Sequence, residues 1–213
     1  MIEVEKIAYM LYPGKIYLNI TNRCSNRCVF CVRNYTDELG GNYLWLTEEP
    51  SAEQIIDSIR EELMTERYSA PEEIIFCGYG EPFYRPEVIL EVLNDIKKVY
   101  PFTRTRINTN GQSLLINSGR SFIPELREFL DAISISLNAH NSSVYQNICR
   151  SLYGEKAFNS IVEFAGEAVK YIDSVILTVV DDRKINSYGR EQKIDMIKSM
   201  EIAHKMGAKF RIR

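Results

Sequence analysis

The segment KIYLNITNRCSNRCVFC, residues 15–31, carries strong signals for both the fold and the site. It opens with a short apolar run over residues 15–20 and then places Cys24, Cys28 and Cys31 on the segment that follows directly. Ligand sites of parallel α/β sheets lie beyond the carboxyl ends of the strands. The stretch therefore predicts a strand with a site at its end.

Five further runs rich in β-branched residues follow, over residues 73–77, 104–108, 132–137, 174–180 and 208–212. The segments between them carry apolar residues at helical spacing, such as Ile55, Ile59 and Leu63. Strands separated by helices run parallel through right-handed crossovers. A closed eight-stranded barrel typically takes about 250 residues, so the alternatives are an open partial (β/α)6 barrel and a flat doubly wound sheet.

Local signals at the helix ends agree with this α/β pattern. Ser51 followed by Gln54 fits a capping box, Pro124 suits a first helical turn, and Gly207 suits a helix stop.

The composition predicts one domain over residues 1–213, because 45% of the residues are hydrophobic and no Pro/Gly/Ser-rich linker divides the chain. A net charge of −3 gives no overall attraction to nucleic acid, which is therefore unsupported as a partner. The N-terminus has no uninterrupted apolar stretch, and no later segment approaches the roughly 20 apolar residues of a membrane span. We expect a cytoplasmic protein with no membrane partner.

The three clustered cysteines have the spacing C-x3-C-x2-C. Three thiolates would occupy three irons of a 4Fe-4S cluster and leave the fourth iron open to a ligand. A zinc site would want a fourth ligand, for which Cys77 or Cys149 is a candidate, and a redox C-x-x-C pair needs only two of these thiols. Those alternatives stay open on spacing alone.

Three arginines, Arg23, Arg27 and Arg33, flank these cysteines. They would favour the thiolate forms, or they are solvated charges.

The cysteine spacing, with Phe30 before the last cysteine, resembles the signature of the radical S-adenosylmethionine (SAM) superfamily. Gly78-Tyr79-Gly80-Glu81-Pro82 follows the second run, where that family carries Gly-Gly-Glu-Pro, and Tyr79 replaces the first glycine of the motif. The stretches 108–111 and 134–138 resemble the family's Thr-Asn-Gly and Ser-Leu-Asp/Asn segments. The alternative to a SAM-binding role is that these stretches simply form turns, since Asn-Gly is a common turn dipeptide.

The resemblance implies a partial (β/α)6 barrel, a 4Fe-4S cluster on the three cysteines, and SAM as the second cofactor. It implies SAM contacts at these positions: Phe30, Gly78, Tyr79, Gly80, Glu81, Asn108, Asn110, Ser134, Ser136 and Asn138. It also implies an oxygen-sensitive enzyme that reductively cleaves SAM to a 5′-deoxyadenosyl radical, which abstracts hydrogen from an unidentified substrate. An external electron donor is implied as a partner, and no general base or nucleophile is assigned.

The sequence YLNITNRCSNRCVFCVRN, residues 17–34, resembles sequences of the TatD-associated radical SAM subfamily. This resemblance implies a functional link to a TatD-like nuclease. Two alternatives remain: a non-catalytic iron-sulfur or zinc accessory protein, and a radical enzyme that modifies nucleic acid. With only Cys77 and Cys149 outside the motif, a second four-cysteine cluster within this chain is disfavoured.

The remaining residues carry weaker expectations. The connection over residues 33–50, with Trp45, is a lid over the site or simply packs on the barrel. We expect Cys77 and Cys149 in the core and His140 and His204 outside the site. Basic residues are expected on a solvated loop, with a phosphate-bearing substrate as the lesser alternative: Arg183, Lys184 and Arg190. Since the chain ends just after the last run, we expect an open barrel side.

Overall fold

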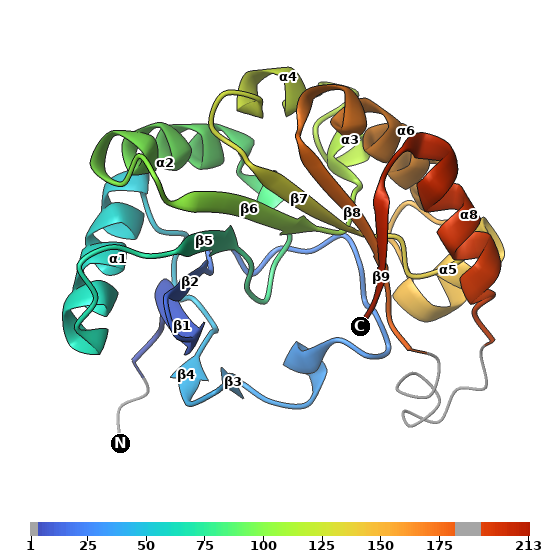
Figure 1. Cartoon of the computed structure of the whole chain (residues 1–213). Coiled ribbons are helices and arrows are strands. Elements are labelled where there is room, and N and C mark those ends of the chain that lie inside the picture. Colours follow the sequence, from blue (N-terminus) through green and yellow to red (C-terminus); the bar gives the residue numbers. More distant parts are fainter. Residues whose placement is uncertain (1–3, 182–192) are drawn as a thin grey trace.

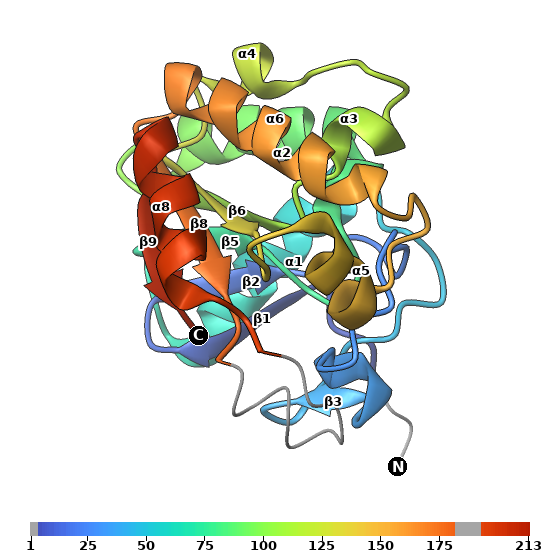
Figure 2. The same ribbon diagram turned by 90° about the vertical axis from the view of Figure 1, so that its right-hand side faces the viewer.

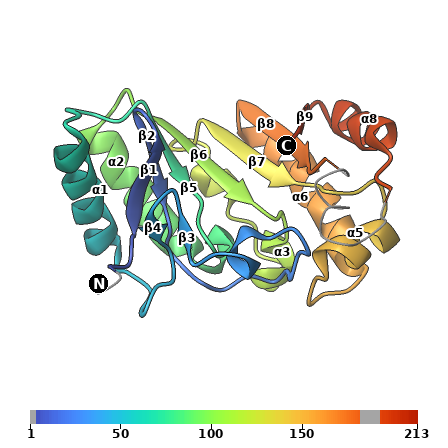
Figure 3. The same ribbon diagram turned by 90° about the horizontal axis from the view of Figure 1, so that it is seen from below.

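The computed structural model describes residues 4–181 and 193–213. A seven-stranded sheet has the order β1-β2-β5-β6-β7-β8-β9, which Figure 3 shows from β1 on the left to β9 on the right. The strand bounds are β1 (Ala8–Tyr12), β2 (Lys15–Leu18), β5 (Glu73–Phe76), β6 (Arg104–Thr109), β7 (Ala132–Ser136), β8 (Ser174–Val179) and β9 (Lys209–Ile212). The six predicted strands are confirmed, and β2, β5, β6, β7, β8 and β9 pair in parallel in this order.

Strand β1 corrects the expectation of an all-parallel sheet, because it pairs antiparallel with β2. Gly14, in the short connection between the two strands, has a φ of 72°, in the left-handed region that glycine adopts without steric cost. A connection this short joins only antiparallel neighbours, whereas parallel strands need a crossover of a dozen or more residues.

Helices line the convex side of the curved sheet as an arch (Figure 1). Their bounds are α1 (Ala52–Glu66), α2 (Pro86–Val99), α3 (Ser113–Ile116), α4 (Ile123–Leu126), α5 (Ser142–Cys149), α6 (Lys156–Tyr171) and α8 (Met196–Met206), with short 3-10 turns η1 (Val32–Asn34) and η2 (Pro82–Tyr84). Of the two alternatives, this arrangement is the partial barrel, since a doubly wound sheet carries helices on both faces.

The predicted helix ends are confirmed. Ser51 accepts from the Gln54 backbone N–H, and the Gln54 side chain accepts from the Ser51 N–H in return. Pro124 lies in the first turn of α4, and Gly207 ends α8 in the left-handed conformation.

Strand alternation gives the sheet two different faces. Apolar side chains such as Ile107, Ile133 and Leu177 are fully buried in the main core. The intervening residues, among them Arg106 and Ser134, belong to the opposite, concave face. The barrel interior is therefore polar, and a polar ligand finds hydrogen-bonding groups there.

The connection over residues 33–50 contains a small antiparallel pair, β3 (Glu38–Leu39) and β4 (Asn42–Tyr43), which the sequence did not predict. Leu44 and Tyr9 are buried with Tyr79 in a second apolar cluster, and Trp45 packs against it. Leu46 is also buried. Packing onto the barrel is thus observed, while movement as a lid stays a hypothesis.

None of the described helices is both long and apolar enough to cross a membrane. The expectation for Arg183, Lys184 and Arg190 falls on residues 182–192, outside the described residues.

Figure 2 shows from the side how β3 and the preceding loop lie below the sheet, at the end away from α4 and α6.

Candidate functional site

The loop that carries the three cysteines follows β2 and is held by α5. Val29 N–H donates to the Ile148 carbonyl at 2.9 Å, and Arg27 N–H donates to the Cys149 carbonyl at 2.9 Å. Leu152 N–H donates to the Ser25 carbonyl at 2.8 Å. These backbone bonds fix the loop to the end of α5, while Cys24, Cys28 and Cys31 each stay partly exposed.

A buried polar network lies beneath this loop, and the sequence did not reveal it. The Gln112 side-chain amide donates to Asn26 Oδ1 at 2.8 Å and to the Tyr145 hydroxyl at 2.9 Å. Asn26 Nδ2 donates to the same hydroxyl at 2.8 Å, and Ser151 Oγ donates to Gln112 Oε1 at 2.7 Å. Because each member is buried and bonded, the network limits movement of the loop.

The thiols of the loop are held in their neutral forms when no metal is bound. A hydrogen bond with Cys149, followed by burial, raises the pKa of Cys28. Burial and then the nearby Glu81 raise the pKa of Cys24 to about 12, and burial raises the pKa of Cys31. A metal-bound thiol is deprotonated outright, so metal binding at these residues would release protons.

Of the three flanking arginines, only Arg33 opposes these shifts at all three thiols. It also donates to the carbonyls of Asn22 and Tyr79, at 3.0 and 3.1 Å. Arg23 instead forms an ion pair with Glu49, at 2.8 Å.

The turn after β5 is packed directly against the start of the cysteine loop. A Cβ on Gly80 would lie 2.1 Å from the Thr21 carbonyl oxygen, and a Cβ on Gly78 would lie 2.1 Å from Asn19 Oδ1. Glu81 N–H donates to the Arg23 carbonyl at 2.8 Å. Gly80 is therefore required by the close approach of two backbones, and Gly78 by the Asn19 side chain that packs against it.

Tyr79 turns its side chain toward the 33–50 connection. Its hydroxyl donates to the Thr36 carbonyl at 2.6 Å, and its ring meets Trp45 edge-on at 5.2 Å between centroids. Only 3% of Tyr79 is exposed. The backbone of Tyr79 belongs to the predicted turn, but its phenol anchors a neighbouring segment, which explains how the family's glycine is replaced.

Glu81 is a buried brace between the turn and the end of β6. Its Oε1 accepts from Thr109 Oγ1 at 2.7 Å and from Phe83 N–H at 3.1 Å, and its Oε2 accepts from Asn110 N–H at 2.6 Å. The Glu81 carboxylate, an expected SAM contact, thus already accepts from three donors of the protein itself.

The burial of Glu81 predicts a pH-dependent stability. Burial raises its pKa from 4.5 to about 7, against the opposing hydrogen bonds. Between these two values the folded protein keeps a proton that the unfolded chain has lost, so the free energy of unfolding falls as the pH rises. The loss is on the order of 3 kcal/mol and complete above the folded pKa.

Urea unfolding of the metal-free wild type and of Glu81→Gln, at about pH 5 and about pH 8, checks this. We expect the wild type to lose stability relative to the variant at the higher pH. An unchanged difference between the two proteins would contradict it.

The predicted polar residues of β6 and β7 divide into two groups. Asn110 Nδ2 donates to Ser25 Oγ at 2.9 Å and lies 3.9 Å from Cys24 Sγ, so it belongs to the cysteine loop. Asn108 Oδ1 instead accepts from Arg106, at 2.9 Å.

Three residues of the β7 end bond to arginines of β9. Ser134 Oγ accepts from Arg211, and Ser136 Oγ and Asn138 Oδ1 accept from Arg213. Asn138 Nδ2 also lies 3.6 Å from Cys149 Sγ. The β6 end is thus joined to the cysteine loop through Asn110, and the β7 end lies beside Cys149 at the end of α5.

The donor set fits an iron-sulfur cluster in its chemistry, since three partly exposed thiols share one loop beside a glycine-lined turn. Within residues 4–181 and 193–213, no three His, Cys, Asp or Glu side chains are gathered as ligands of a single metal ion. Phe30 is partly buried and packs against the main core.

The family model of the radical SAM superfamily matches residues 18–188, which is most of the chain. The chain belongs to the radical SAM superfamily. Proteins of this superfamily bind a 4Fe-4S cluster and SAM, and they are enzymes. The matched range begins at Leu18, the last residue of β2, and includes the cysteine loop, the glycine turn and the ends of β6 and β7.

A curated relative of this radical SAM chain is the FeMo cofactor biosynthesis protein NifB of Chlorobaculum tepidum. It is 26% identical over 138 residues, which cover 63% of this chain and 30% of that protein. The radical SAM chain thus spans less than a third of this relative.

Solved structures share the fold at 14% identity. TYW1 with a lysine-pyruvate adduct bound has a TM-score of 0.61, with 94% of this chain and 65% of that one covered. A radical SAM methyltransferase from Sphaerobacter thermophilus has a TM-score of 0.58, covering 96% and 67%. HydG, a maturase of the [FeFe]-hydrogenase, has a TM-score of 0.61, covering 93% and 41%.

Several residues lie away from the site or differ from expectation. His140 Nδ1 accepts from Asp195 N–H at 3.0 Å, and His204 lies exposed in the last turn of α8. Cys149 is buried as predicted, but Cys77 is only partly buried because it follows the core residue Phe76 and alternation turns it inward.

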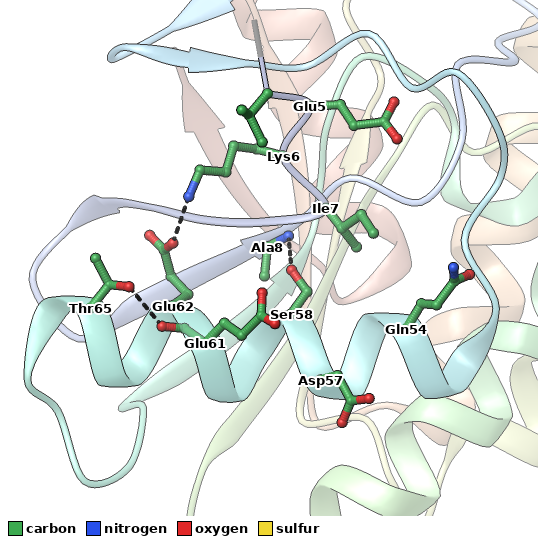
Figure 4. A pocket seen from close by; sticks show the side chains of 11 residues that line it. Glu5, Lys6, Ile7, Ala8, Gln54, Asp57, Ser58, Glu61, Glu62 and Thr65 are labelled. Carbon is green, nitrogen blue, oxygen red and sulfur yellow. Dashed lines mark hydrogen bonds and ion pairs between the residues drawn. The ribbon is translucent and has the colours of Figure 1, made fainter. Parts of the chain in front are cut away.

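A hollow of about 340 Å³ lies outside the barrel, between the N-terminal segment and α1 (Figure 4). Lys6 and Glu62 pair at 3.3 Å across it, and Ser58 accepts from the Ala8 N–H. Other polar groups of its lining have partners outside it, such as Asp57, which pairs with Arg60.

Proposed function

We propose that Cys24, Cys28 and Cys31 hold the 4Fe-4S cluster of this radical SAM protein. The observation that supports this most is the convergence of the cysteine loop with the glycine turn and Asn110. Three thiols leave one iron without a protein ligand, which is the position a bound cosubstrate needs.

The turn over residues 78–81 is the proposed SAM cradle. Gly78 and Gly80 bring the backbone close, and Glu81 fixes the turn to the end of β6 rather than offering an open carboxylate. The proposed SAM contacts are those of the sequence analysis: Phe30, Gly78, Tyr79, Gly80, Glu81, Asn108, Asn110, Ser134, Ser136 and Asn138. Tyr79 would contribute through its backbone.

The reaction we propose is reductive cleavage of SAM. The bound cluster would supply the electron that breaks the S–C bond of SAM, giving methionine and a 5′-deoxyadenosyl radical that takes hydrogen from a substrate. The residues around it act as positioners: the network of Asn26, Gln112 and Tyr145 restrains the loop, and Arg33 ties the loop to the turn.

We further propose membership of the TatD-associated subfamily, with a functional link to a TatD-like nuclease, an external electron donor and a cytoplasmic location. The sequence of residues 17–34 supports the subfamily.

The test is to purify the chain without oxygen, reconstitute it with iron and sulfide, reduce it, and measure 5′-deoxyadenosine formed from SAM. The Cys24→Ala/Cys28→Ala/Cys31→Ala variant is the control. We expect product only from the intact protein. A well-formed cluster that neither binds nor cleaves SAM would favour the iron-sulfur accessory protein, and stoichiometric zinc without a cluster would exclude both.

A further inference from the structure

Two arginines on the concave face of β9 carry charge that no carboxylate of residues 4–181 and 193–213 offsets in an ion pair. Arg211 and Arg213 lie two residues apart and so point to the same side of the sheet. Each crosses the neighbouring strand β8 and donates to a serine of β7, at 3.3 Å to Ser134 Oγ and 3.1 Å to Ser136 Oγ. Among the described residues, neither forms an ion pair, in contrast to Arg106, which pairs with Glu73 at 2.9 Å.

Within the part of the chain that the structure describes, most hydrogen-bond donors of these arginines have no acceptor. A guanidinium has five N–H donors, and the observed bonds of each side chain involve one nitrogen. Both residues are exposed. Serine and asparagine are neutral acceptors, so they orient the guanidinium groups without compensating their charge.

The two arginines connect the cysteine loop with a basic hollow. Arg213 lies close enough to the thiols of Cys77, Cys28 and Cys149 to interact with them electrostatically. Arg211 lines a cavity of about 350 Å³ at the amino-terminal ends of the strands. Its charged lining has four basic and two acidic residues: Lys15, Arg104, Arg106, Arg211, Glu72 and Glu73. The concave face is thus basic from this cavity to the site.

We propose that Arg211 and Arg213 bind the anionic group, carboxylate or phosphate, of the substrate of this chain. The planar fork of a guanidinium matches both groups through paired hydrogen bonds. Each serine hydroxyl accepts from an arginine and keeps its own O–H to donate, so Ser134 and Ser136 position the arginines and can still contact SAM. The inference rests on the proposed function, because it places the substrate on the concave face beside the cysteine loop.

The test measures binding of two probes, inorganic pyrophosphate and succinate, to the reconstituted protein with SAM present, by titration calorimetry. One variant, Arg211→Gln/Arg213→Gln, removes both charges. The other, Arg211→Lys/Arg213→Lys, keeps the charges but removes the paired hydrogen-bond donors of the guanidinium. Arg127→Gln, at an exposed arginine that follows α4, is the matched control. SAM affinity and the unfolding temperature are measured for each protein.

We expect one probe to bind the wild type and the control, and the Gln variant to bind it at least about tenfold more weakly at unchanged SAM affinity. The Lys variant should show an intermediate loss. Binding of pyrophosphate would indicate a phosphate group on the substrate, and binding of succinate would indicate a carboxylate.

Binding of neither probe to the wild type would overturn the inference, as would equal weakening in Arg127→Gln or a parallel loss of SAM affinity. 5′-Deoxyadenosine formation by the wild type is measured separately. Intact SAM cleavage without anion binding refutes only the substrate class, whereas anion binding without SAM cleavage refutes only the proposed function.

Discussion

Replacing any one of Cys24, Cys28 or Cys31 by alanine is expected to abolish both cluster assembly and SAM cleavage. The reconstituted wild type should hold about four irons per chain, and each variant should fall toward zero, because two thiolates no longer retain the cluster. 5′-Deoxyadenosine should drop to the level found without reductant. Iron and sulfide analysis, with product quantified by mass spectrometry, checks both expectations.

Cys77→Ala is the matched control, since Cys77 is a partly buried cysteine outside the loop. It should keep the iron content of the wild type. Cys149→Ala is more discriminating, because Cys149 is hydrogen-bonded to Cys28. If Cys149→Ala lost the cluster while Cys28→Ala kept it, the proposed ligand set would be wrong.

Gly80→Ala should be the most disruptive substitution outside the cysteines. The added Cβ would lie 2.1 Å from the Thr21 carbonyl oxygen and 2.8 Å from that of Arg23, both backbone atoms that cannot rotate away. The turn must therefore shift and strain the Glu81 N–H bond to Arg23. We expect a loss of about 3 kcal/mol or more in the free energy of unfolding, with SAM binding weakened at least about tenfold.

Gly166→Ala in α6 is the control, because its added Cβ would meet no atom within 4 Å. It should stabilise the protein by about 0.5–1 kcal/mol. Denaturant unfolding and equilibrium SAM binding measure the two effects. Wild-type stability and SAM affinity in Gly80→Ala would show that the turn does not need its close approach to the loop.

The parallel strands could be predicted because each carries apolar or β-branched residues at every second position, and segments of helical spacing separate the strands. Strand β1 was missed for two reasons. Its N-terminal segment has few strand signals, and the turn at Gly14 that joins it to β2 was not recognised as the connection of an antiparallel pair. The pair β3 and β4 was missed because its two-residue strands are too short to show a period.

In the site, the motifs gave positions but not side-chain directions. Tyr79 was assigned to the SAM turn by its neighbours, whereas its direction is set by Trp45 and Thr36, which come from another part of the chain. Glu81 was expected to contact SAM. Its three hydrogen-bond donors are brought to it only by folding, so the sequence did not show that its carboxylate is already occupied. The network of Gln112 and Tyr145 has no local signal at all.

Arg211 and Arg213 could have been found from the sequence. Their spacing in Arg-Ile-Arg matches the alternation that placed Ser134 and Ser136 on one face. What the sequence lacked was their reach across β8, which depends on the curvature of the sheet.

We propose that three thiols leave one iron open and that SAM binds there, beside the turn over residues 78–81. The most direct measurement is electron-nuclear double resonance on the reduced protein with SAM carrying ¹⁵N in its amino group and ¹⁷O in its carboxylate. A strong coupling of both nuclei to the cluster, absent in Gly80→Ala, is predicted. An intact reduced cluster with no coupling to either nucleus would contradict the account.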